Sequence, residues 1–361
     1  MYVCKRFELY IILFLQSGKG MRGMSIQQQK QLRKQVTPYE KSEIWISVKQ
    51  LLNTMVPFFV LWYLAYISLS VSYLLTLGIC VIAAGFVVRM FIIFHDCCHG
   101  SFFKNRRANV IIGNITGVLT LFPFNQWKYS HNVHHASSGN LDKRGVGDIW
   151  MMTVEEYATA SYKERLLYRI YRNPIILFGI GPIFAFLITN RFNRKGARKK
   201  ERMNTYMINV VIVALVAFFC YTLGWKSFLM VQGPIFYISG VLGIWLFYVQ
   251  HTFEDSYFEE NEEWEYVKAA VEGSSFYKLP KLLQWLTGNI GYHHVHHLSP
   301  KVPNYHLEEA HNHTEPLKSV PTITLWTSLK SLKFRLWDED GNKFVTFRDA
   351  RNIIKRKSTS T

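Results

Sequence analysis

Long apolar stretches are the strongest pattern along this chain. Residues 53–94 contain a single charged residue, Arg89. One membrane-spanning helix needs about 20 apolar residues, so this stretch is long enough for two. The polar positions that would form the turn between them are Ser68, Ser70 and Ser72.

A second pair of apolar stretches covers residues 206–225 and 227–250, with little more than Lys226 between them. A large soluble core can contain one such helix, but four in one chain favour a membrane protein. The pattern therefore predicts an integral membrane protein with four transmembrane helices.

Two shorter apolar blocks, residues 110–124 and 174–188, are interrupted by glycine or proline. Each has about 15 residues, which is short for a span, so we expect interfacial or re-entrant segments. The predicted fold class is thus an all-α integral membrane protein with four transmembrane helices and additional interfacial or re-entrant helices.

The charge pattern orients these spans. Lys and Arg exceed Asp and Glu by 17, and they gather at residues 30–41, 191–202 and 351–357. Basic loops are retained on the cytoplasmic side of a membrane, and four spans place all three basic segments on that side. We favour this explanation over nucleic-acid binding, and we predict no nucleic-acid partner.

The N-terminal residues and the cysteines add little. Met21 and Met24 open a polar, basic stretch typical of a protein start, so residues 1–23 are a candidate upstream extension rather than a signal peptide. The five cysteines form no disulfide framework and suit a reducing, cytosol-facing site.

Three histidine clusters carry the candidate chemistry, at residues 95–99, 131–135 and 293–297. Each repeats the spacing of one helix face, i and i+4 in the first cluster and i, i+3 and i+4 in the other two. Eight converging imidazoles are twice what a closed zinc site needs, which favours two metal ions. The predicted ligands are His95, His99, His131, His134, His135, His293, His296 and His297.

Imidazole spacing alone does not identify the metal. A zinc hydrolase of the His-Glu-x-x-His type needs a glutamate that none of the clusters has; the first has Asp96 there. A metal transporter is the non-enzyme alternative, but it needs polar groups along an ion path, and the predicted spans are nearly free of them. We interpret the isolated His306, His311 and His313 as structural or exposed.

The longer strings around the clusters are HDCCHGSFF from His95, WKYSHNVHH from Trp127, NLDKRGVGDIW from Asn140, GSSFYKLP from Gly273 and NIGYHHVHHLSP from Asn289. Together with the clusters, they resemble the membrane fatty acid desaturase family from about residue 51 to 321. They are most similar to its bacterial acyl-lipid branch, of the Δ5 type of Gram-positive bacilli.

The resemblance implies a cytoplasmic, histidine-rich cap that holds two iron ions, with O2 as co-substrate. It implies phospholipid acyl chains as substrate, ferredoxin or flavodoxin as electron donor, and a multi-pass protein of the cell membrane. It divides the chain into a basic N-terminal segment (1–50), the desaturase domain (51–321) and a C-terminal cytoplasmic tail (322–361). A hydroxylase or other oxygenase of the same family remains the alternative enzyme.

Two further histidines receive distinct predictions. His251 ends the last predicted span, and related desaturases use a histidine there, so we expect it to be a ninth metal ligand. His294 lies about 60° beyond the arc shared by His293, His296 and His297 on a helix of about 100° per residue. We therefore expect His294 to point away from the metals, with a hydrogen bond to a ligand as its remaining role.

Overall fold

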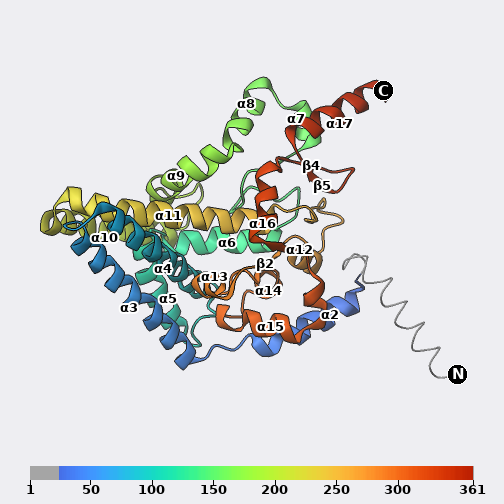
Figure 1. Ribbon diagram of the computed structural model, residues 1–361. Coiled ribbons are helices and arrows are strands. Elements are labelled where there is room, and N and C mark those ends of the chain that lie inside the picture. The colour runs from blue at the N-terminus through green and yellow to red at the C-terminus, as the bar shows by residue number, and fades with distance from the viewer. Residues whose placement is uncertain (1–23, 361) are drawn as a thin grey trace.

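The protein is built mainly from helices, and four of them are long (Figure 1). A computed structural model describes residues 24–360, so the candidate extension at 1–23 lies outside the described residues. Each long helix has 25 or 27 residues and extends about 38–41 Å, more than the roughly 30 Å of bilayer hydrocarbon. They are α3 (Ile44–Ser68), α4 (Tyr73–His99), α10 (Lys199–Leu223) and α11 (Trp225–His251).

These helices confirm the four predicted spans. They are the four described helices that are long and apolar enough to cross a membrane one by one. The turn between α3 and α4 lies at the predicted serines, where the hydroxyls of Ser68 and Thr76 are 2.8 Å apart. The second turn corrects the prediction, because Lys226 lies in the first turn of α11 and the break is at Gly224. Gly224 has φ +80°, a conformation that favours glycine over larger residues.

The first short apolar block forms α5 (Arg106–Thr120), which is bent by 96° from the following helix α6 (Phe124–Ser137). The two helices pack closely at the bend. A Cβ atom on Gly113 of α5 would lie 2.2 Å from the Phe124 ring, so only glycine fits there. The bend fits the predicted re-entrant segment, although the pair is also long enough to form a broken span.

The second short block is broken in the same manner. A helix α8 (Tyr162–Tyr171) leads to a π-helical turn η2 (Ile176–Ile180) and then to α9 (Gly181–Leu187) and η3 (Thr189–Arg191). The helix axis bends by 60° between α8 and the following segment, Ile175–Arg191. Counting each bent pair as one span would raise the number of spans to six.

Most of the remaining helices form a cap at one end of the bundle, on the right in Figure 1. Its apolar core joins valines and leucines of α2, α12, α14 and α15, including Leu32, Val271 and Val295. The helices of the cap are α2 (Ile26–Val36), η1 (Thr37–Tyr39), α12 (Tyr266–Glu272), α13 (Lys281–Leu286), α14 (His293–Leu298), η4 (Asn304–His306), α15 (Leu307–His313), η5 (Glu315–Ser319), α16 (Leu325–Ser328) and η6 (Leu329–Lys333).

Five short strands connect distant parts of the chain. In one sheet β4 (Leu336–Asp338) pairs in parallel with β1 (Met152–Thr153) and antiparallel with β5 (Lys343–Val345). In the other, β2 (Phe276–Lys278) pairs in parallel with β3 (Thr322–Thr324). The helices α7 (Val154–Thr159) and α17 (Phe347–Ser360) lie beside the first sheet. The C-terminal segment therefore returns to pack against the middle of the chain.

Candidate metal centre

The three histidine clusters and the end of α11 meet where the long helices enter the cap. His95 and His99 lie on the last two turns of α4, and His251 is the last residue of α11. The second cluster lies on α6 and the third on the short helix α14, so both have the predicted helical spacing. The structure thus brings together all nine candidate ligands.

Eight of the nine histidines form two groups, and the ninth adjoins one of them. In the five-histidine group, one ring nitrogen of each residue lies within 4.8 Å of the others; its members are His95, His99, His131, His135 and His296. The three-histidine group, by the same measure, contains His134, His251 and His297. His293 adjoins this second group, with its Nε2 3.0 Å from Nε2 of His251.

Histidines of the same sequence cluster belong to different groups. On α6, His131 and His135 join the five-histidine group while His134 joins the three-histidine group. On α14, His296 and His297 likewise belong to different groups. Each of these helices therefore lies between the two groups and contributes to both.

The spacing of the nitrogens fits metal coordination. Nε2 of His135 lies 3.0 Å from Nε2 of His131 and 2.9 Å from Nε2 of His296. Two nitrogens that bind one ion at about 2.1 Å and at right angles would be about 3.0 Å apart. Among the candidate ligands in the described residues, Nε2 of His99, His134 and His297 also has no hydrogen-bond partner, as do Nδ1 of His135, His293 and His296. A cation in each group would satisfy these Nε2 atoms.

Hydrogen bonds at Nδ1 orient several of the rings. Nδ1 of His95 lies 3.0 Å from the Asp96 carboxylate, and Nδ1 of His134 lies 2.5 Å from that of Asp148. Nδ1 of His251 lies 3.2 Å from the carbonyl oxygen of Gly273. An imidazole that donates its Nδ1 proton keeps its Nε2 lone pair for a metal, which is the usual arrangement around bound ions.

Burial also keeps the ligands in their neutral form. Burial, followed by the neighbouring imidazoles, holds the pKa values of His293, His296 and His297 well below the usual range for histidine. Metal ligation requires the deprotonated ring nitrogen, so these side chains are ready to bind near neutral pH.

The second oxygen of the Asp96 carboxylate, which does not contact His95, is also hydrogen-bonded. This oxygen, Oδ2, accepts hydrogen bonds from the backbone N–H of Asn304 at 2.7 Å and from the side-chain amide of Asn304 at 2.8 Å. The amide of Gln50 donates in turn to Oδ1 of Asn304 at 2.7 Å. A chain of hydrogen bonds thus runs from α3 through the cap to His95.

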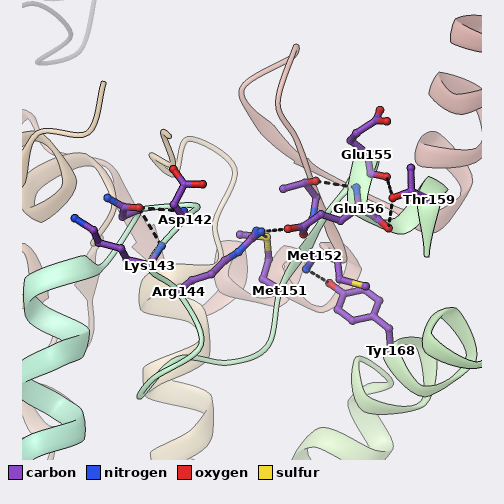
Figure 2. A network of polar contacts seen from close by, with 11 residues as sticks. Asp142, Lys143, Arg144, Met151, Met152, Glu155, Glu156, Thr159 and Tyr168 are labelled. Carbon is purple, nitrogen blue, oxygen red and sulfur yellow. Dashed lines mark hydrogen bonds and ion pairs between the residues drawn. The ribbon is translucent and has the colours of Figure 1, made fainter. Parts of the chain in front are cut away.

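A cavity of about 560 Å³ reaches the three-histidine group. Its wall includes the candidate ligands His134 and His251 together with Phe247, Arg144 and Glu156. Figure 2 shows Arg144 directed at Glu156, with which it forms an ion pair. The carboxylate of Glu156 also accepts a hydrogen bond from the Thr153 backbone N–H, which caps α7.

His294 is directed away from both groups, as its helical angle predicts. Its Nε2 lies 3.0 Å from Nδ1 of His311, and it belongs to neither group of candidate ligands. The expected hydrogen bond to a metal ligand is therefore replaced by one to His311. Of the other isolated histidines, His306 is buried between the carboxylates of Glu309 and Glu43, and His313 stacks on Tyr39.

The residues that orient the ligands could not be predicted from the sequence. Asp96 stands where a zinc hydrolase has its general base, and Asp148 is one residue of the string NLDKRGVGDIW. Their positions in the sequence are too weak a signal to assign a role, since Asp96 lies inside the first histidine cluster and Asp148 lies 13 residues after the second. Asn304 is a polar residue among others in its segment, and its contact with Asp96 depends on the tertiary fold.

Comparison with known proteins gives a consistent match. The fatty acid desaturase family matches residues 68–324. A fatty acid desaturase of Bacillus subtilis (strain 168) is 70% identical over 325 residues, covering 90% of this chain and 92% of that protein. The sn-1 oleoyl-lipid 12-desaturase of Synechocystis is 26% identical, covering 78% of each chain. The sn-1 acyl-lipid omega-3 desaturase (ferredoxin) of Synechocystis is 28% identical, covering 64% of each.

Proposed function

Because the chain belongs to the fatty acid desaturase family and is a desaturase enzyme, we propose that it introduces a cis double bond into acyl chains of membrane phospholipids. The bond is placed at Δ5, as expected for the branch that the sequence resembles. The observation that carries the proposal is the meeting of nine histidines in two groups where the long helices enter the cap.

The proposed cofactor is a pair of iron ions, one in each histidine group. When bound, iron would activate O2 so that it can oxidise an unactivated methylene group, whose hydrogen no side-chain base can remove. The overall reaction takes two hydrogens from adjacent carbons of the acyl chain. With O2, two electrons and two protons, it yields the alkene and two molecules of water.

The side chains contribute positioning and exclusion of water. Asp96, Asp148 and the Gly273 carbonyl orient the imidazoles of His95, His134 and His251. Apolar rings shield the groups from water. The indole of Trp127 stacks on His131 with 4.2 Å between ring centres, and Phe247 packs 5.1 Å from His134. A dry site limits side reactions of the oxidant.

The electrons come, in this proposal, from a separate ferredoxin or flavodoxin that docks on the cytoplasmic face. The printed name of a Synechocystis relative includes ferredoxin, which supports this class of donor. The loop of residues 191–202 holds the basic run RFNRKGARKKER, which suits an acidic partner.

The proposed orientation has a direct test. Single cysteines at Arg198 and at Lys226 are labelled with a membrane-impermeant reagent in intact cells and in inverted vesicles. Residue 226 should react in intact cells and residue 198 only in inverted vesicles. Labelling of both from the same side would contradict cytoplasmic histidine clusters.

The deciding experiment is expression in a host whose lipids lack double bonds, followed by mass-spectrometric location of any new double bond. A Δ5 alkene in phospholipid, together with two irons per chain in the purified protein, supports the proposal. A hydroxylated chain indicates the oxygenase alternative. Metal uptake by vesicles without any lipid product indicates the transporter.

A further inference from the structure

Arg172 is a buried cation without a counter-charge. Its side chain follows α8 and is 2% exposed. One Nη donates to the hydroxyl of Tyr248 at 3.2 Å and to the carbonyl of Phe334 at 3.0 Å, and Nε has no partner. Across residues 24–360, no aspartate or glutamate forms an ion pair with it.

This arrangement is unfavourable without an anion. The guanidinium remains charged under all ordinary conditions, and a buried charge that is not paired costs several kcal/mol. Arg89, also buried, likewise makes two hydrogen bonds, from Nε to Thr54 and from one Nη to the Trp285 carbonyl, but it does not line the cavity that reaches the histidines. Arg335 adds to the positive charge near Arg172, since it too donates to Phe334 and pairs with no acid in the described chain.

Arg172 also lines the cavity that reaches the metal centre. The 560 Å³ space has Arg172 and Tyr248 in its wall together with the candidate ligands His134 and His251. The volume is within the range of small-molecule sites. Tyr248 lies one turn before His251 at the end of α11, where the helix leaves the membrane for the cap.

We propose that Arg172 binds the phosphodiester of the phospholipid whose acyl chain is desaturated. The inference rests on the proposed function and adds the part of the substrate that anchors it. A guanidinium fork matches two phosphate oxygens, and lipid phosphates lie at the depth where a spanning helix ends. Because the anchor and the candidate ligands share one cavity, the acyl carbons near the ester would lie closest to the metals.

The matched control is a second arginine in the same wall. Arg144 lines the cavity but already pairs with Glu156, as Figure 2 shows. Because the Glu156 carboxylate already neutralises the charge of Arg144, a lipid phosphate would stabilise this side chain little. Arg144→Gln should therefore bind lipid like the wild type, within about threefold.

The test measures binding without O2 or electron donor. The purified holoenzyme is titrated by calorimetry with dihexanoylphosphatidylglycerol below its micelle concentration, and with dihexanoylglycerol, which lacks the phosphate. The wild type should bind the phospholipid at least about tenfold more tightly. Arg172→Gln should lose that preference and bind the diacylglycerol as before, while Arg172→Lys, which keeps the charge, should retain part of it.

Competitors identify the source of the phosphate. Coenzyme A and inorganic phosphate are titrated in the same way. If either binds in a manner that depends on Arg172 and the phospholipid does not, the site serves an acyl carrier or free phosphate, and the lipid assignment is wrong. Unchanged phospholipid preference in Arg172→Gln would also overturn it. If Arg172→Gln fails to retain iron, Arg172→Lys decides the matter, since unchanged binding there shows that the fork is not used.

The kinetic result separates this inference from the proposed function. With whole phospholipid as substrate, Arg172→Gln should raise KM by about tenfold and leave kcat nearly unchanged. If the wild type and Arg172→Gln both desaturate phospholipid with the same KM, the proposed function stands and the role of Arg172 as an anchor is wrong. If lipid binding depends on Arg172 but the protein forms no alkene, the anchor stands and the proposed function is wrong.

Discussion

The two histidine groups differ in how firmly their surroundings hold them. The five-histidine group is enclosed by α4, α6 and α14, and the Asp96 side chain that orients His95 is 2% exposed. The three-histidine group borders the cavity, and the Asp148 side chain that orients His134 is 19% exposed. Asp96 accepts two hydrogen bonds from Asn304, while the free oxygen of Asp148 accepts one from the Gly145 backbone.

This difference resembles the contrast between closed and open metal sites. A closed site uses all its positions for protein ligands, whereas a catalytic site keeps a position for substrate or water. We interpret the five-histidine group as the more rigid holder and the three-histidine group, with His293 beside it, as the part that admits reactants. Four predictions are ordered from the largest expected effect to the smallest, and the first two test this interpretation.

Replacing one ligand in either group should abolish desaturation but leave the iron of the other group bound. His135→Ala and His297→Ala should both lower activity more than about 1000-fold, because an ion with an incomplete ligand set cannot be held or oriented. Since the groups share no histidine, His297→Ala should retain about one iron per chain. Iron analysis and lipid profiling measure both effects, and His313→Ala, which alters an exposed stacking contact, is the control.

Replacing Asp96, which is held more firmly, should lower iron affinity more than replacing Asp148. In Asp96→Asn an amide N–H would face one of the Asn304 donors or His95, leaving buried groups unpaired. We expect iron affinity to fall about 100-fold in this variant and about tenfold in Asp148→Asn. Equal losses in a chelator-competition assay would show that the two groups are held equally.

His293 and His294 should differ although they are adjacent. His293 faces His251, and His294 faces His311, so His293→Ala should remove iron and activity while His294→Ala lowers activity by less than about tenfold. Both variants are scored for bound iron and unsaturated lipid in the same preparation. A dead His294→Ala beside an active His293→Ala would contradict the helical register of α14.

The smallest effect is expected from acid. Burial, followed by the charge of Lys318, lowers the pKa of His311 to about 4. The unfolded chain binds a proton there near pH 6.5 and the folded chain does not, so this residue adds stability above that pH, which is lost as the pH falls toward 4. The unfolding temperature should fall across that window, and less steeply in His311→Gln. An identical pH dependence in both proteins would exclude this contribution.

The sequence predicted the framework of the fold because it depends on local features. Apolar length defines the four spans, and helical spacing places the histidines of each cluster on one face. The assignment of His296 and His297 to different groups could not be predicted, because it depends on how α14 sits between α6 and α11. The same holds for Asn304 beside Asp96 and for the unpaired charge of Arg172, since the absence of an acid partner is a property of the tertiary structure. The domain limits at residues 50 and 321, and iron as the metal, stay predictions.

The pairing of β1 with β4 has a consequence for the biogenesis of the enzyme. Met152 is aligned with Leu336, and Phe344, near the end of the chain, forms part of the cavity wall. At a synthesis rate of about 5–20 residues per second, roughly 10–40 s separate the emergence of the two strands from the ribosome. During that interval the histidines of α4 and α6 have been synthesised while the wall of the cavity is incomplete. A nascent chain therefore cannot enclose a substrate, which delays oxidative chemistry until translation is nearly finished.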